Sequence, residues 1–218
     1  MSVYRTILSG GTGELIEKKS RFIAVTDSID SQEQAQQVIA HCKKKYYDAG
    51  HHCFAYTLGM HHEMQHFSDD GEPSGTAGKP ILDLLVREDI HNAVIVVTRY
   101  FGGTLLGTGG LVRAYQGAAQ EGLRKSRMID KIQGLHFYIK IDYNTLGKIQ
   151  YILNQEKITI LDAQYAQNVE LHLVITEADI ERLSDIIKNE TSGNVELRRG
   201  ENTEFALVDR EIILFNIE

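Results

Sequence analysis

Several features that mark special structural classes are scarce or missing in this chain of 218 residues. Two cysteines, Cys42 and Cys53, are too few for a disulfide framework and suit a reducing cytosol. Two prolines exclude long proline-rich linkers. The longest uncharged apolar run, Ala93 to Val97, is far shorter than the roughly 20 residues of a membrane span. The N-terminus lacks the basic stretch and apolar core of a secretory signal. We therefore expect a cytosolic protein without a membrane partner.

The overall composition is that of a folded globular protein, but the charge is unevenly distributed. Hydrophobic residues make up 42% and charged residues 24% of the chain. Residues 1–128 hold 14 basic and 14 acidic side chains, whereas residues 129–218 hold 9 and 16 and so carry the whole net charge of −7. This asymmetry predicts two domains, residues 1–128 and 129–218.

The hydrophobic periodicity of residues 1–128 predicts a sheet flanked by helices. A turn at Gly10-Gly11 would join the first two strands as neighbours. The first helix would be capped by Ser31, and the last would bury a face of small residues against the sheet. The stretch from Gly59 to Pro80 shows no regular pattern. The expected strands are Tyr4–Leu8, Glu14–Lys18, Arg21–Thr26, His52–Leu58 and Ala93–Tyr100, and the expected helices are Gln32–Tyr47, Ile81–Val86 and Gly109–Arg127.

The pattern of elements in residues 129–218 predicts a ferredoxin-like domain. Strand and helix patterns follow one another in the order β-α-β-β-α-β, which is the split βαβ arrangement. An extended tail, Phe205–Phe215, comes after them. The chain as a whole is therefore expected to be α+β. The elements expected here are Leu135–Ile141, Asn144–Gln155, Ile158–Gln164, Val169–Thr176, Glu177–Asn189 and Val195–Arg199.

Two polar loops of residues 1–128 are the candidates for a functional site. The stretch Phe67–Pro80 combines three carboxylates with three hydroxyls and a lysine, although it is also compatible with a solvated turn. The stretch Tyr100–Gly110 contains five glycines and leads into a helix. Its free N–H groups, with Arg99 and Arg113 nearby, predict a site for an anion.

Catalytic motifs are weaker. His62-Glu63-Met64-Gln65-His66 matches the H-E-x-x-H zinc motif as text, but the stretch is too short and too broken for the helix that the motif requires, which favours an exposed histidine-rich loop. Dinucleotide and P-loop fingerprints do not fit the glycines. Cys53 and His51 could form a nucleophile and base, but a small buried residue is the better interpretation of Cys53.

Long stretches of the chain resemble the YigZ proteins of the IMPACT family. The stretches are His51-His52-Cys53, Phe67–Pro80, Val97–Tyr115 and Lys18-Lys-Ser-Arg-Phe22. The resemblance implies an N-terminal domain like the second domain of ribosomal protein S5 and a ferredoxin-like C-terminal domain. This pair is similar to the last two domains of elongation factor G, which implies an RNA or ribosome surface. Eukaryotic relatives regulate translation, and the family carries no established catalytic activity.

We therefore expect a non-enzymatic, cytosolic protein that binds the ribosome, RNA or a translation factor and regulates translation. No metal, cofactor or DNA partner is expected. The alternative is a hydrolase, either metal-dependent through His62, Glu63 and His66 or acid/base through Asp69 and Asp70. The candidate binding residues are His51, His52, Ser68, Asp69, Asp70, Glu72, Thr76, Lys79, Arg99, Tyr100 and Arg113.

Overall fold

Strand β6 (Ala93–Tyr100) is the centre of the first sheet, and it is buried along nearly its whole length. Its alternate residues belong to two different hydrophobic clusters. Ala93, Ile95 and Val97 face one cluster, whereas Val94 and Val96 face the other. The continuous apolar run follows from this position, since a strand covered on both faces has no polar face.

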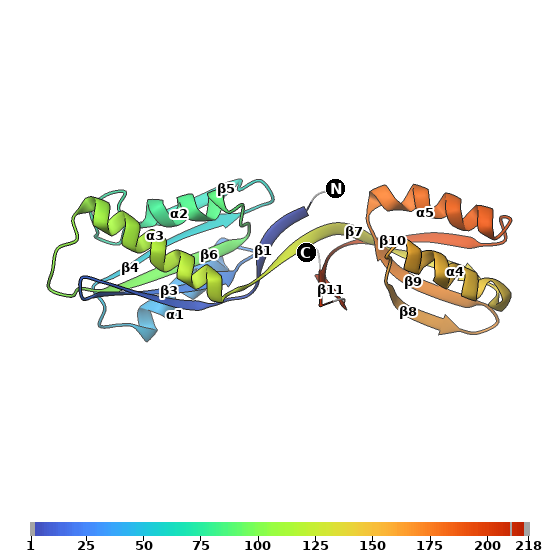
Figure 1. The fold of residues 1–218 in the computed structure, drawn as a ribbon, viewed down its shortest axis with the longest axis horizontal. Helices are drawn as coiled ribbons and strands as arrows, with labels where there is room; N and C mark the ends of the chain where they lie inside the picture. The colour runs from blue at the N-terminus through green and yellow to red at the C-terminus, as the bar shows by residue number, and fades with distance from the viewer. Residues whose placement is uncertain (1–2, 210, 216–218) are drawn as a thin grey trace. The chain divides into compact units, whose positions relative to one another are not determined.

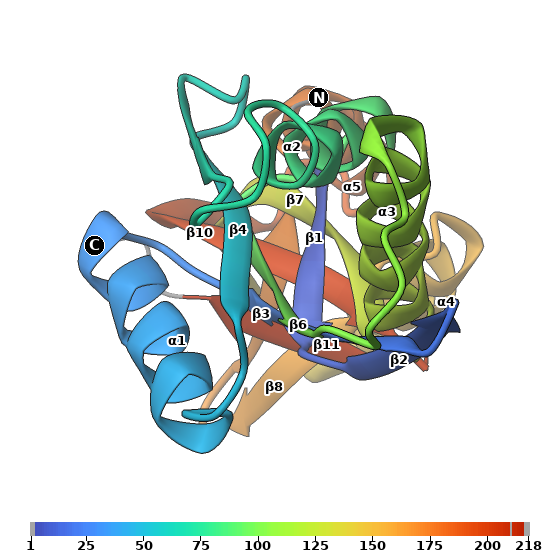
Figure 2. The same cartoon turned by 90° about the vertical axis from the view of Figure 1, so that its left-hand side faces the viewer.

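The sheet around β6 has five antiparallel strands, and helices lie on both of its faces. Helix α1 (Gln32–Lys45) packs on one face, and α2 (Gly78–Arg87) and α3 (Thr108–Lys125) pack on the other, as Figure 2 shows. The strand order is β2 (Thr12–Glu17), β3 (Ser20–Ser28), β6, β4 (His51–Leu58) and β5 (Met64–Ser68).

The predicted close packing of the last helix is confirmed. A Cβ atom added to Gly13 on β2 would lie 2.4 Å from backbone atoms of Glu121 and Gly122 on α3. A Cβ atom on Gly122 would lie 3.0 Å from Ala24 of β3. The helix backbone therefore sits almost directly on the sheet, which only glycine permits at these two positions.

The hairpin predicted around Gly10-Gly11 is wrong. Strand β1 (Val3–Ser9) pairs with β7 (Arg127–Ile141) rather than with β2. The glycines instead bring the chain against β3. Gly11 exchanges hydrogen bonds with Thr26, and a Cβ atom on Gly10 would collide with the Thr26 carbonyl.

The stretch Gly59–Pro80 is more regular than predicted. It contains β5 and the first turn of α2. Strand β5 is a sheet edge whose first four residues are exposed, so its sequence has no apolar alternation to detect. Pro80 is accommodated because the N–H groups of a helix's first turn have no partner within the helix.

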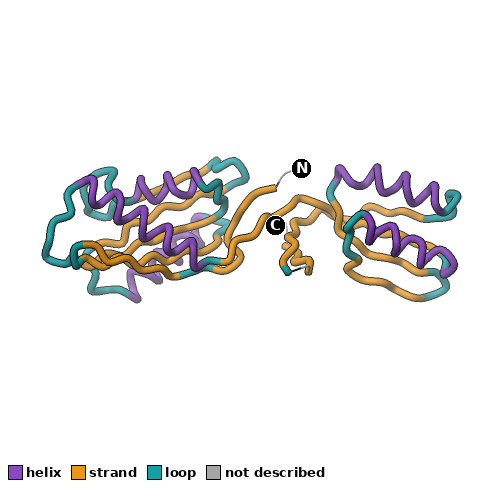
Figure 3. The backbone as a smooth tube through the Cα atoms, in the orientation of Figure 1, coloured by secondary structure: helices purple, strands orange, loops and turns teal. Residues whose placement is uncertain are grey.

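The second sheet carries the predicted ferredoxin-like arrangement. Its elements follow the order β-α-β-β-α-β, and the central strands are arranged β10-β7-β9-β8 with antiparallel pairing throughout. Two helices lie against this sheet (Figures 1 and 3). Leu135, Phe137, Ile139 and Ile141, which were predicted to share one face, form a hydrophobic cluster with side chains of both helices. The elements are β7 (Arg127–Ile141), α4 (Tyr143–Gln155), β8 (Ile160–Tyr165), β9 (Val169–Ile175), α5 (Glu177–Glu190) and β10 (Glu196–Val208).

The C-terminal tail is a hairpin rather than a single extended segment. Strand β10 has an irregular register between Arg199 and Asn202 and then continues to Val208. Strand β11 (Glu211–Phe215) pairs back onto it, with Phe205 opposite Leu214.

This computed structural model describes residues 3–209 and 211–215. The outer ends of the two predicted domains, residues 1–2 and 216–218, lie outside the described residues. The chain divides into two compact units, Tyr4–Ile129 and the part from Asp130 onward with Val3. Among the described residues, no helix has the length and apolar character needed to cross a membrane.

Candidate functional site

The two candidate loops lie at one end of the first sheet. The register places His51 at the start of β4 opposite Arg99 near the end of β6. Arg21 pairs with Tyr100, and Phe54 pairs with Ser68. The loops that follow Ser68 and Tyr100 therefore leave the sheet at the same end, which we name the His51 end. Helices α2 and α3 also begin after these loops.

Asp69 organises the first loop through backbone hydrogen bonds. Its Oδ1 atom accepts from the N–H groups of Ala77 at 3.0 Å and Gly78 at 2.8 Å, and its Oδ2 atom accepts from Gly75 at 2.7 Å. Helix α2 lacks a cap from its own N-cap side chain. Asp69 supplies that cap from eight and nine residues upstream, where a carboxylate also suits the positive end of the helix dipole.

Asp70 connects the same loop to β4. Its Oδ2 atom accepts the backbone N–H of His52 at 2.6 Å, and its carbonyl oxygen accepts from the His51 ring at 2.8 Å. Lys43 at the end of α1 lies 3.7 Å from the second carboxylate oxygen. Asp70 has φ +42°, a left-handed conformation that aspartate tolerates better than most residues.

Glu72 is the acceptor of a buried network beneath the loop. Its Oε1 atom accepts from Arg99 at 2.6 Å and from the hydroxyl of Tyr115 at 2.7 Å. The Arg99 guanidinium also donates to Ser20 at 3.3 Å. The ring of Phe101 covers the guanidinium at 5.5 Å. Arg99 is thus committed to an internal carboxylate. Burial raises the pKa of Tyr115, so its hydroxyl stays protonated and donates.

The other predicted site residues are also mostly engaged within the protein. Buried Thr76 donates to the Pro73 carbonyl, and the ring of buried His52 lies 3.0 Å from the Thr98 hydroxyl. Burial lowers the pKa of His52. Tyr100 donates to Asp48, a hydrogen bond that raises the pKa of Tyr100.

Two predicted cations lie on the surface and not in the buried network. Lys79 is exposed and pairs with Asp83 one turn along α2. Arg113 is exposed on α3, whereas Arg99 is buried against Glu72. The two arginines predicted to hold one anion therefore have different environments.

Exposed cations surround the His51 end. They come from the β2–β3 turn, from the last turn of α1, from the first turn of α2 and from the second turn of α3. The Gly-rich loop packs on the β2–β3 turn, because a Cβ atom on Gly102 would lie 2.0 Å from the backbone of Lys19. We name this group the cationic rim, and its members are Lys18, Lys19, Lys43, Lys44, Lys45, Lys79 and Arg113.

Sequence reasoning missed Ser20 and Tyr115, which complete the Arg99 network. For Tyr115 a signal exists. It follows Ala114 on a helix face of small residues, where a large side chain with a polar tip needs a buried hydrogen-bond partner. Ser20 has no comparable signal.

The cysteines have no nucleophilic character. Cys53 is buried and donates to the carbonyl oxygen of Asp69 at 3.0 Å. Burial raises its pKa to about 12 and that of Cys42 to about 11. A thiolate is the reactive form, so this environment does not support a Cys53–His51 pair.

The stretch His62–His66, whose sequence matches the H-E-x-x-H pattern, does not adopt the helical structure of that zinc-binding motif. His62 and Glu63 lie before β5, and His66 lies on β5 itself. The His66 ring packs on Tyr56 at 5.4 Å. A strand does not bring residues four apart to the shared helical face that the motif needs.

The two units and the loops of the His51 end define a two-domain α+β protein, and comparisons with known proteins give the family. The family model of the Impact N-terminal domain matches residues 18–123, and that of a domain of unknown function (DUF1949) matches residues 139–194. The chain belongs to the IMPACT family.

Two curated relatives and a solved structure extend over most of the chain. The IMPACT family member YvyE of Bacillus subtilis is 36% identical over 92% of this chain and 92% of its own. YigZ of Escherichia coli is 36% identical over 83% of this chain and 89% of its own. A crystal structure described as that of a hypothetical protein is 32% identical, covers 92% of this chain and 98% of its own, and has a TM-score of 0.59.

Proposed function

We propose that the protein is a non-enzymatic, cytosolic component of translation whose N-terminal domain, residues 1–128, binds the ribosome, RNA or a translation factor. The observation that carries the proposal is the contrast at the His51 end. The loop carboxylates are engaged in internal hydrogen bonds, whereas the cationic rim is exposed. Membership of the IMPACT family, with the role in translation that it implies, supports the same direction.

The distribution of charge favours a phosphate-bearing partner for this domain. Lys43 and Lys79 each have an acidic neighbour at the surface, which weakens but does not remove their potential. The glycines that precede α3 allow a partner's backbone to approach the chain closely. The C-terminal domain, residues 129–218, carries the net −7 and is not expected to supply the phosphate contacts.

The geometry supports binding better than acid/base hydrolysis. A general acid or base needs a carboxyl group that reaches the substrate and exchanges a proton. Both oxygens of Asp69 accept backbone N–H groups, and Asp70 accepts the N–H of His52. These carboxylates build the loop.

Co-sedimentation of the full chain with ribosomes over a salt series tests the proposal. The informative variant is Lys18→Glu/Lys19→Glu, which reverses the charges of two exposed residues of the rim. Each neutralised phosphate contributes about 0.9 to the slope of log K against log salt. We therefore expect the slope to fall by roughly 1–2 and the binding to weaken at every salt concentration.

The matched control is Arg124→Glu/Lys125→Glu at the opposite end of α3. It makes the same change in net charge at a distance from the rim, and it should leave the slope near that of the unmodified chain. An equal loss of ribosome binding in both variants would mean that binding depends on the net charge of the chain and not on the rim. Ribosome binding that neither variant affects would place the contact outside the rim and overturn the proposed surface.

A further inference from the structure

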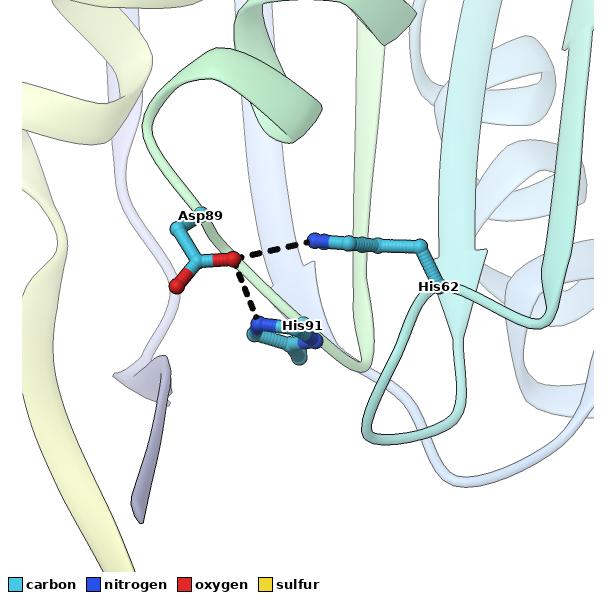
Figure 4. A group of neighbouring side chains, drawn as sticks. All are labelled: His62, Asp89 and His91. Carbon is cyan, nitrogen blue, oxygen red and sulfur yellow. Dashed lines mark hydrogen bonds and ion pairs between the residues drawn. The ribbon is translucent and has the colours of Figure 1, made fainter. Parts of the chain in front are cut away.

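Three side chains with metal-binding chemistry meet at the other end of the first sheet. His62 comes from the loop between β4 and β5, and Asp89 and His91 come from the loop between α2 and β6 (Figure 4). The Asp89 Oδ1 atom lies 3.3 Å from Nε2 of His62 and 2.9 Å from Nε2 of His91. One nitrogen or oxygen atom from each residue lies within 4.8 Å of the other two.

His91 is oriented as a metal-binding histidine usually is. Its Nδ1 atom lies 3.3 Å from the carbonyl oxygen of Gly59, and a carbonyl only accepts, so Nδ1 donates. In the neutral ring this leaves the lone pair on Nε2, which faces Asp89. Histidine ligands commonly donate their second ring N–H to a carbonyl in this way. The side chain is 5% exposed, and the ring of Tyr4 packs on it at 5.8 Å.

The position of His62 is similarly restricted. Its side chain is 10% exposed, and its ring stacks on that of His91 with centroids 3.9 Å apart. Its Nδ1 atom is buried and has no hydrogen-bond partner within residues 3–209 and 211–215. No contact to Nδ1 fixes the tautomer, so the ring proton is able to reside on Nδ1, which leaves the lone pair of Nε2 for an ion.

The polar atoms of the three side chains face one another. The Oδ1 atom of Asp89 faces the Nε2 atoms of both histidines. The neutral tautomer of His91 would direct a lone pair at this carboxylate over 2.9 Å. A divalent cation between the three atoms satisfies both lone pairs and the carboxylate at once.

We propose that His62, Asp89 and His91 form a binding site for a divalent transition-metal ion of the zinc class, held through the two Nε2 atoms and a carboxylate oxygen. Two imidazoles and one carboxylate are nitrogen and oxygen donors that suit zinc and its neighbours rather than magnesium or calcium. Ligand atoms about 2.0–2.1 Å from zinc in a tetrahedron are about 3.3 Å apart. The two distances to Asp89 are close to this value.

The site differs from the H-E-x-x-H pattern and from the site proposed for partner binding. Of that pattern it uses only His62, while its other two ligands lie 27 and 29 residues further along the chain. It stands at the Ala93 end of β6, opposite the His51 end. The Asp89 side chain is 79% exposed, so the ion has a route from solvent and room for water. The bound ion would join the β4–β5 loop to the α2–β6 loop.

Zinc titration of the metal-stripped full chain tests the proposal, with calorimetry, elemental analysis and the melting temperature as readouts. We expect one zinc ion per chain and a melting temperature that rises with zinc but not with magnesium. Asp89→Asn and His62→Asn should each weaken zinc affinity by at least 10–100-fold. Asparagine suits the left-handed backbone at both positions, where φ is +52° and +54°.

His66→Gln is the matched control, because it removes the second histidine of the H-E-x-x-H text and leaves the proposed ligands intact. Its zinc affinity should equal that of the unmodified chain. The proposal is overturned if the unmodified chain binds no zinc, if Asp89→Asn and His62→Asn keep full affinity, or if His66→Gln loses as much as His62→Asn.

Discussion

The guanidinium of Arg99 lies 2.6 Å from the carboxylate of Glu72, and the two side chains are only 6% and 4% exposed. The pair joins the end of β6 to the middle of the 69–77 loop. Tyr115 adds α3 to the same carboxylate. Three segments far apart in the chain are thereby fixed beneath the surface formed by the cationic rim. A buried pair of this kind holds a geometry even where its net contribution to stability is small.

Removing one partner of this pair should strongly destabilise the first unit. Arg99→Met leaves the Glu72 carboxylate buried without its counter-charge, so the free energy of unfolding should fall by about 3–5 kcal/mol. Arg99→Met combined with Glu72→Gln should lose less than Arg99→Met alone, because no charge then remains buried. Urea unfolding of both variants measures the difference.

The control for this prediction is Arg21→Ala. Arg21 forms an ion pair with Glu14 at 2.8 Å, and both side chains are exposed. The loss of this side chain should hardly change the free energy of unfolding. A loss as large as that of Arg99→Met would show that burial is not the origin of the Arg99 effect.

Asp69 should contribute to the stability of helix α2. Asp69→Ala leaves the N–H groups of Ala77 and Gly78 without their acceptor, which we expect to cost about 1–2 kcal/mol of unfolding free energy. Asp69→Asn should cost less, since the amide oxygen still accepts. Amide hydrogen exchange at Ala77 and Gly78 should accelerate in the alanine variant. Asp83→Ala, on the exposed face of the same helix, should leave these amides protected.

Both cysteines should be unreactive in the native protein. With pKa values raised to about 12 for Cys53 and about 11 for Cys42, almost no thiolate forms at pH 8. Iodoacetamide should therefore label neither residue at this pH until the chain is unfolded, when both should react. Rapid native labelling of Cys53 detected by mass spectrometry would contradict the buried, protonated thiol.

Stability should fall on mild acidification because of His172. Burial lowers its pKa in the folded chain, with further lowering from His136 and Arg198 and partial opposition from Asp162 and Glu170. The unfolded chain takes up the proton near pH 6.5, so it binds more protons than the folded chain below that pH. The contribution of the neutral His172 ring to the stability of the fold is therefore complete above about pH 6.5. It is lost as the pH falls toward the lower pKa that His172 has in the folded chain.

Melting temperatures measured from pH 8 to pH 5 check this effect. His172→Gln should melt with a shallower pH dependence than the unmodified chain below pH 6.5. His41→Gln, at an exposed position of α1, is the comparison for simple loss of a histidine. Identical pH profiles for the unmodified chain and His172→Gln would refute the assignment.

Much of the fold was predictable because burial imposes a period on the sequence. The alternation from Leu135 to Ile141 identified both a strand and its buried face, and the helix of Glu177–Asn189 followed from its spacing. Strand β5 was not predicted, because an edge strand with exposed residues shows no alternation of apolar and polar residues. The pairing of β1 was not predicted, because Gly10 and Gly11, which suggested a hairpin, instead allow the chain to lie close to β3.

The candidate site was predictable as a region but not as a set of contacts. Composition identified the loop with Asp69 and Glu72, yet the partners of these carboxylates lie up to 43 residues away. Only the folded chain shows that Arg99 pairs with Glu72 rather than with an external anion. The meeting of His62 with Asp89 depends likewise on two loops that the sheet brings together.

Strand β6 contributes side chains to both hydrophobic layers of the first unit. Its odd-numbered apolar residues support α2 and α3, while Val94 and Val96 support α1. Neither layer is therefore able to melt alone, since loosening either one exposes an apolar face of the same strand. The unit is built to open as a whole. A substitution that loosens β6 at either end should therefore affect both layers.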